Sequence, residues 1–151
     1  MITKSGCLFC EITKDKIPSY KIYENERFIA ILDIFPNIKG QTLVLPKEHV
    51  GSYAFDMSDE QLAEFMQFTK QVTRILETRL PVPRVHLVLE GTAIDHLHAK
   101  LYPAIGMKNK DDRVVAEEKV KFEKYPGYIS TLLGPRASDE ELEALQKQLR
   151  K

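Results

Sequence analysis

The chain has 151 residues, and its 22 Lys and Arg are balanced by 22 Asp and Glu, so the formal net charge is zero. That length fits one domain of roughly 100 to 200 residues, and the lack of a basic excess argues against duplex nucleic acid or an anionic membrane as a partner. No apolar run approaches the roughly 18 residues of a membrane span. The first residues lack the basic start and apolar stretch of a signal peptide, so we expect a cytoplasmic protein.

Both cysteines lie near the start of the chain, in Cys7-Leu8-Phe9-Cys10. In a protein expected to be cytoplasmic, this spacing favours a metal site over a structural disulfide. Two alternatives stay open. One is a redox pair, which needs a preceding strand and a helix N-terminus to lower a thiol pKa, and the other is a pair of ordinary buried cysteines.

Five segments rich in β-branched, aromatic or leucine residues and bounded by turn formers are predicted strands. The connections at residues 25–27 and 35–40 are short, which favours antiparallel pairing. The predicted strands are residues 20–24, 28–33, 41–45, 84–89 and 96–102.

A long helix is predicted between the third and fourth strands. Ser58 followed by Gln61 forms a capping-box pattern at its start, and Pro81 and Pro83 end it. Its apolar positions keep mostly to spacings of three and four, which predicts one buried face. These positions are Leu62, Phe65, Met66, Val72, Leu76 and Leu80.

The predicted fold class is α+β, with residues 1–106 as the main domain and residues 107–151 as an extension packed on it. The aromatic, Gly- and Pro-rich segment 125–135 is predicted to be an ordered loop. A second capping box, Ser138 with Glu141, opens a C-terminal helix. Its narrow apolar stripe consists of Leu142, Leu145 and Leu149.

Two of the four histidines fall together in the last predicted strand, as His96 and His98. Alternate strand residues share a face, so these histidines and Lys100 are predicted to project to one side while Leu97 and Ala99 project to the other. A solvated polar strand face is the alternative. His86 is interpreted as a core or sheet-face histidine, and the sequence contains neither a P-loop motif nor a Rossmann glycine motif.

These elements together carry a family resemblance. The sequence has an N-terminal Cys-x-x-Cys, followed by Asp33-Ile34-Phe35-Pro36, the segment from Lys39 to His49, and the alternating histidines. With these motifs it resembles the histidine triad family from Cys7 to Pro103. The resemblance implies a five-stranded antiparallel sheet, one main helix, homodimerisation, and hydrolysis or transfer of a nucleotide at its α-phosphate.

The resemblance also implies catalytic roles. His98 matches the nucleophile that forms a nucleotidyl-histidine intermediate, and His96 matches the histidine whose backbone orients that ring. Lys100 stands where the family has its third histidine. A lysine supplies positive charge to phosphate but is a poor proton relay; the alternative is an exposed lysine without a role.

Structural zinc is the implied cofactor, held by Cys7, Cys10, His49 and His96. The alternative is that His49 merely caps a loop and His96 faces phosphate. Purine nucleotide binding is implied for a further set of residues, with Asp33 at the ribose, apolar side chains around the base, and Gly91 and Thr92 at the phosphate. The apolar residues, which could equally be plain core, are Leu8, Phe9, Ile12, Ile31 and Leu32.

The main functional hypothesis is therefore a nucleotide hydrolase or transferase that acts on a purine nucleotide conjugate, either a dinucleoside polyphosphate or a phosphoramidate. Lys100 and the short segment 89–95 motivate a rival from another class, a non-catalytic nucleotide-binding module. A small zinc-stabilised interaction protein is a third hypothesis, which requires that no nucleotide binds.

Overall fold

The computed structural model describes residues 3–149, which divide into two compact units. The first unit extends to Asp112 and the second begins at Arg113, close to the boundary predicted after residue 106. Packing of the extension on the main domain stays a prediction. None of the helices in the described residues combines the length and the apolar character needed to cross a membrane.

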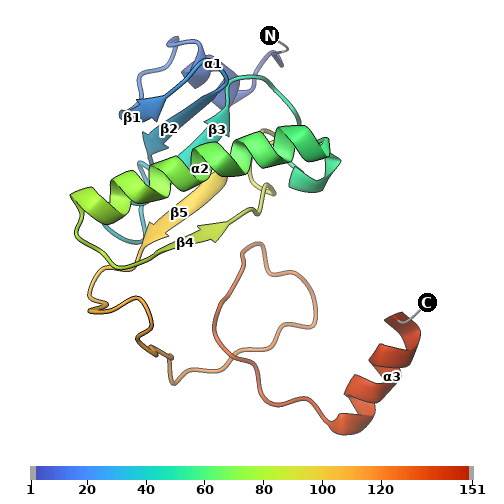
Figure 1. Cartoon of the computed structure of the whole chain (residues 1–151). Coiled ribbons are helices and arrows are strands. Elements are labelled where there is room, and N and C mark those ends of the chain that lie inside the picture. Colours follow the sequence, from blue (N-terminus) through green and yellow to red (C-terminus); the bar gives the residue numbers. More distant parts are fainter. Residues whose placement is uncertain (1–2, 150–151) are drawn as a thin grey trace. The chain divides into compact units, whose positions relative to one another are not determined.

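A five-stranded sheet forms the centre of the first unit, as predicted (Figure 1). The strand order is β1-β2-β3-β5-β4, and each neighbouring pair is antiparallel. β5 therefore lies inside the sheet and β4 at its edge. The strands are β1 (Lys21–Glu24), β2 (Phe28–Leu32), β3 (Thr42–Pro46), β4 (Val85–Val88) and β5 (Ala99–Pro103).

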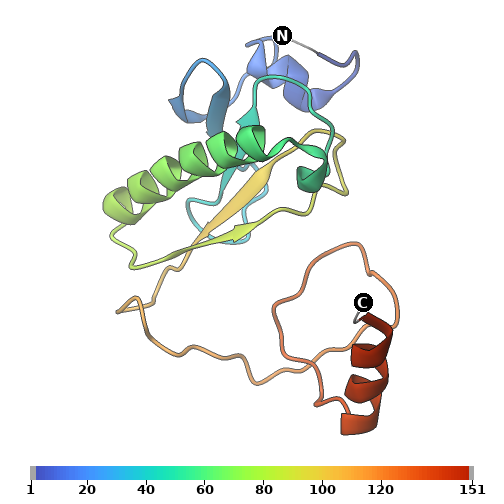
Figure 2. The same cartoon turned by 45° about the vertical axis from the view of Figure 1, so that its right-hand side comes forward.

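The long helix α2 (Asp59–Arg79) lies across one face of this sheet (Figures 1 and 2). Its capping box is present: Ser58 Oγ accepts from the Gln61 N–H, and the Gln61 side chain accepts from the Ser58 N–H. Phe65, Val72 and Leu76 are buried as their spacing predicts, whereas Met66 is 36% exposed. Phe68, which the predicted set omits, is buried, so the buried face of the helix includes Phe68 rather than Met66.

A short helix, α1 (Leu8–Thr13), packs on residues of the opposite sheet face. Alternate residues of β2 and β3 point to opposite sides, so each of these strands contributes to both cores. Ala30 and Val44 belong to the cluster under α2, while Ile31 and Leu43 belong to the cluster that includes Phe9 of α1. This second cluster brings the start of the chain against the sheet.

The second unit contains a loop that closes on itself and the helix α3 (Asp139–Leu149). A bridge pairs Lys119 with Leu133, and the Phe122 and Tyr128 rings meet edge to face at 5.6 Å. Ser138 Oγ accepts from the Glu141 N–H, which confirms the second capping box. In the predicted apolar stripe Leu142 and Leu149 are exposed, and the Leu145 side chain lies outside the described residues.

Replacing the fully buried Phe65 of α2 with alanine tests the packing of this helix. We expect Phe65→Ala to lower the free energy of unfolding by about 3 to 5 kcal/mol, because it removes apolar contacts and leaves a cavity. Its neighbour Met66 provides the matched control, and Met66→Ala should change the same quantity by about 0.5 kcal/mol or less. Urea unfolding followed by circular dichroism measures both, and equal losses would contradict the assigned helix face.

Candidate functional site

The two neighbouring histidines are buried where the chain enters the central strand β5. His96 is fully buried and His98 is 3% exposed, so a solvated polar strand face is the wrong interpretation. The strand begins at Ala99 rather than at residue 96 as predicted, because the chain bends at His96 before it pairs. The alternation of sides nevertheless extends beyond the strand, since the intervening Leu97 belongs to the core under α2.

Both histidine rings lie against Phe9 of α1, on the sheet face away from α2. The centroid of the Phe9 ring is 5.7 Å from that of His96 and 5.2 Å from that of His98, and both contacts are edge to face. Phe9 is itself buried. The α1 helix thus limits the orientations that the two imidazoles can adopt.

A backbone hydrogen bond fixes the tautomer of His98. Its Nδ1 lies 2.8 Å from the carbonyl oxygen of His96, and because a carbonyl only accepts, Nδ1 carries the proton. The other ring nitrogen, Nε2, then holds the free lone pair. Burial lowers the pKa of the His98 imidazole, so the neutral ring is favoured at pH 7.

The side chain of His96 turns toward the two cysteines. Its Nε2–H donates to the Pro46 carbonyl at 2.9 Å, which leaves the Nδ1 lone pair facing Cys7 Sγ at 3.4 Å and Cys10 Sγ at 3.5 Å. His49 Nδ1 lies 3.5 Å from Cys10 Sγ. One ligand atom from each of these four residues lies within 4.8 Å of the other three.

This Cys/His cluster has the dimensions of a metal site. In a tetrahedral site, zinc bonds of 2.3 Å to sulfur and about 2.05 Å to nitrogen place neighbouring ligand atoms about 3.5 Å apart, which matches the observed separations of sulfur and nitrogen. Cys7 and Cys10, three residues apart at the start of α1, share one side of that helix. The four predicted ligands fit a closed Cys2His2 site, which favours the metal interpretation over a redox pair or two plain buried cysteines.

Lys100 is half-buried and forms an ion pair, so it is not a plain exposed lysine. Its Nζ donates to Glu90 Oε2 at 2.8 Å, and the side chains are 23% and 11% exposed. Burial opposes the charge of Lys100, but the hydrogen bond and the negative charge of Glu90 prevail, so the pKa of the ammonium is raised. Thr92 Oγ1 donates to the other oxygen of Glu90 at 3.1 Å.

Glu90 is the site residue that the sequence analysis missed. It lies two residues beyond the end of β4, and the pairing of Val88 with Lys100 places it beside the start of β5. An antiparallel alignment of these two strands would have revealed it. The sequence predicts both strands but leaves their register open.

The Asp33 carboxylate stabilises the turn after β2. Its Oδ1 accepts from the Phe35 N–H at 2.9 Å and its Oδ2 accepts from Gln41 Nε2 at 2.6 Å. Each carboxylate oxygen keeps further lone-pair capacity. The negative charge of Asp33 also acts on His98 and Lys100. A turn-forming role for Asp33 is therefore compatible with a position near the site.

The residues predicted around a base differ in burial. Phe9, Ile12 and Ile31 are buried together in the cluster under α1, whereas Leu8 is 45% exposed and Leu32 is half-buried. Phe9, Ile12 and Ile31 therefore contribute to the core, whether or not they also contact a base.

Gly91 is required by the packing of two loops. Its φ is +72°, and a Cβ there would lie 2.3 Å from the Ser52 carbonyl oxygen, so no other residue fits without a shift of the backbone. With Thr92, Glu90, Tyr53 and other residues, it lines a hollow of about 300 Å³ beside the Lys100 pair.

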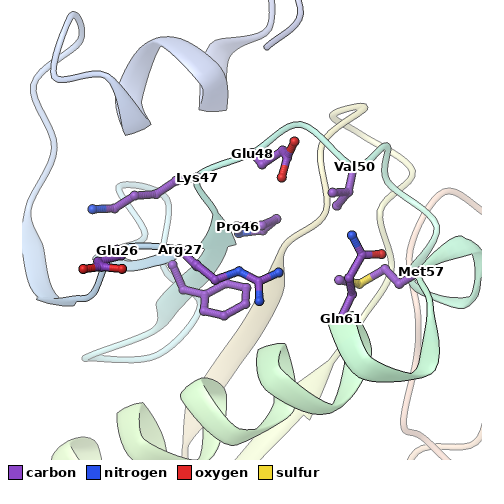
Figure 3. Close-up of a pocket in the computed structure, with 9 residues that line it drawn as sticks. Glu26, Arg27, Pro46, Lys47, Glu48, Val50, Met57 and Gln61 are labelled. Carbon is purple, nitrogen blue, oxygen red and sulfur yellow. The ribbon is translucent and has the colours of Figure 1, made fainter. Parts of the chain in front are cut away.

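A separate cavity of about 220 Å³ lies between the ends of β2 and β3 and the start of α2 (Figure 3). Its cations are already paired, Arg27 with Glu64 and Lys47 with Glu24. None of the predicted site residues lines it. The candidate site is therefore the histidine pair with its neighbours, and this cavity is not part of it.

Comparisons with known proteins agree with this arrangement. The HIT domain family model matches residues 14–104, well over half of the chain. An adenosine 5'-monophosphoramidase of Schizosaccharomyces pombe is 35% identical over 104 residues, covering 65% of this chain and 74% of the relative. A HIT family hydrolase from Clostridium thermocellum is 28% identical with a TM-score of 0.61, covering 72% of this chain and 99% of that structure.

A HIT family protein from Bacillus subtilis extends the fold likeness, with a TM-score of 0.66 over 96% of this chain and 95% of that structure, at 24% identity. The family match begins after both cysteines, so the Cys/His cluster is an independent observation. The match includes the five-stranded sheet and the segment that carries His96 and His98. The chain belongs to the HIT, or histidine triad, family.

Proposed function

We propose that the protein is a nucleotide hydrolase or nucleotidyl transferase that cleaves a purine nucleotide conjugate at its α-phosphate. The S. pombe relative that supports this is an adenosine 5'-monophosphoramidase, and Candida albicans and Saccharomyces cerevisiae relatives carry the same description. The observation that carries the proposal is the hydrogen bond from His98 Nδ1 to the His96 carbonyl. That bond leaves the lone pair of Nε2 as the nucleophile.

In the proposed reaction, His98 Nε2 attacks the α-phosphorus, and the leaving group departs with the electron pair of its bond to phosphorus. A polyphosphate leaves as an anion, whereas an amine takes a proton from solvent as it leaves. A new N–P bond forms, and the ring becomes cationic because Nδ1 keeps its proton. The carbonyl of His96 accepts from that proton and stabilises the developing charge. In the second step, water or another acceptor attacks phosphorus, releases its proton to solvent, and displaces Nε2, which regains its lone pair.

Other residues take supporting roles in this proposal. Lys100 holds a fixed positive charge near the leaving group, Asp33 accepts from ribose hydroxyls, and Gly91 with Thr92 approaches phosphate. We also propose that Lys100, in place of a third histidine, marks a branch of the family. Homodimerisation and a cytoplasmic location stay predictions from the sequence.

We propose structural zinc for the Cys/His cluster. With four protein ligands the site would have no open position for water, so the metal would stabilise the fold and would not take part in the reaction. Its effect on the nucleophile would be indirect, because His96 would be one of the residues that hold the metal and its carbonyl orients His98.

A non-catalytic nucleotide-binding module is the second candidate. The observation that favours it is the ion pair between Lys100 and Glu90, since an ammonium held by a carboxylate donates no proton to a departing amine. Binding of AMP without turnover of any adenylylated substrate would select it.

His98→Ala tests the proposed nucleophile. We expect kcat for an adenylylated substrate to fall by at least about 10³-fold, because the attacking atom is lost, while AMP still binds. His86→Asn is the matched control, since His86 is exposed on the edge strand, and it should retain activity. A His98→Ala variant with wild-type turnover would refute the assignment.

Metal analysis tests the cluster. We expect about one zinc per chain in the purified wild type and almost none in Cys10→Ser. The substitution should also lower the melting temperature, because binding of a structural metal contributes to folding. The proposal would be contradicted if the purified wild type contained no zinc and added zinc did not increase its stability.

Lys100→His tests leaving-group preference. An amine must gain a proton as its P–N bond breaks, whereas a polyphosphate departs as an anion that a fixed cation stabilises. We expect the substitution to shift the kcat/KM ratio of an adenosine phosphoramidate to a dinucleoside polyphosphate by at least about tenfold toward the phosphoramidate. An unchanged ratio would show that Lys100 does not set this preference.

A further inference from the structure

The carboxylate of Glu90 lies beside the proposed catalytic residues because of strand register. In the antiparallel pair β4–β5, Val88 is opposite Lys100. The chain beyond Val88 therefore runs alongside the residues that precede Lys100, among them His98. The negative charge of Glu90 acts on both His98 and Lys100.

Both oxygens of this carboxylate are engaged. Oε2 accepts from Lys100 Nζ at 2.8 Å and Oε1 accepts from Thr92 Oγ1 at 3.1 Å. The carboxylate side chain is only 11% exposed, so its contacts hold the ammonium in one place with little screening by solvent. Gly91, between Glu90 and Thr92, is itself tightly packed against the Ser52 backbone, so the backbone next to Glu90 has little room to shift.

The pairing changes what the ammonium of Lys100 does for a bound nucleotide. A lone cation attracts a negatively charged phosphate in the ground state as well as in the transition state, and equal binding of the two does not raise kcat. A neighbouring carboxylate offsets that ground-state attraction. Its hydrogen bond still fixes the donor in position for the charge that develops only as the leaving group departs.

We propose that Glu90 is a positioning residue that holds Lys100 for the leaving group and weakens its attraction for phosphate in the ground state. This inference rests on the proposed function and extends it to a residue that does not itself touch the substrate. It applies to this chain because Lys100 replaces a histidine, which would not need a carboxylate to offset a permanent charge.

The test compares Glu90→Gln with Lys100→Met, and Glu77→Gln is the matched control. Glu77 also forms an ion pair, with Arg74 on α2, and lies outside the site. For each variant we would measure kcat and KM with a dinucleoside polyphosphate, the dissociation constant of AMP by calorimetry, and the melting temperature. Glu90→Gln should lower kcat about tenfold and tighten AMP severalfold, whereas Lys100→Met should lower kcat and weaken AMP.

Opposite signs for AMP affinity separate positioning from a merely structural role, because a loosened site would weaken AMP in both variants. Glu90→Gln with wild-type kcat, or with AMP weakened as in Lys100→Met, would overturn the inference. AMP binding by the wild type without turnover would refute the proposed function, and the sign of the AMP change would then report only whether Glu90 weakens the attraction of Lys100 for phosphate.

If Glu90→Gln does not fold, Glu90→Asp provides the test of the positioning role instead. The shorter side chain keeps the charge but withdraws the carboxylate from Lys100 by about one methylene group. We expect kcat to fall while the AMP dissociation constant stays within about twofold of wild type. Wild-type kcat in Glu90→Asp would overturn the positioning role.

Discussion

The hydrogen bond between His98 Nδ1 and the carbonyl oxygen of His96 is the interaction on which the site depends. It joins two functions in one residue, because the side chain of His96 belongs to the Cys/His cluster while its backbone selects the tautomer of its neighbour. A carbonyl oxygen can only accept a hydrogen bond, so Nδ1 of His98 carries the proton. Whatever fixes His96 therefore also fixes the ring that we propose as the nucleophile.

Several elements far apart in the sequence fix His96. Pro46 at the end of β3 accepts from its Nε2, Phe9 of α1 packs on its ring, and Cys7 and Cys10 face its Nδ1. The short helix α1 could not hold its position by its own helix propensity, because helices of fewer than 12 residues are marginal in water. Burial against β2 and β3, together with the proposed metal, is what supports it.

Most of the fold could be predicted from the sequence because its signals are local. The α2 helix has a capping box at Ser58 and a regular apolar face, and the strands have β-branched runs between turn formers. The four members of the Cys/His cluster were also predicted, through the family resemblance, and they do lie together. By contrast, the start of β5 was predicted three residues too early, since apolar alternation continues through Leu97 although pairing begins at Ala99.

Glu90 shows what local signals cannot provide. Its contact with Lys100 depends on the register of β4 against β5, and register is set by packing across the sheet rather than by either strand alone. The same limit applies to Leu8 and Leu32, which the family resemblance groups with Phe9 although their burial differs.

The stereochemical course at the α-phosphorus tests the central claim most directly. A nucleotidyl-His98 intermediate requires two successive in-line displacements, each of which inverts the configuration at phosphorus. An adenosine phosphorothioate ester of known chirality, turned over in ¹⁸O-labelled water, should therefore give a product with retained configuration. Inversion would mean direct attack by water, and it would contradict a covalent role for His98.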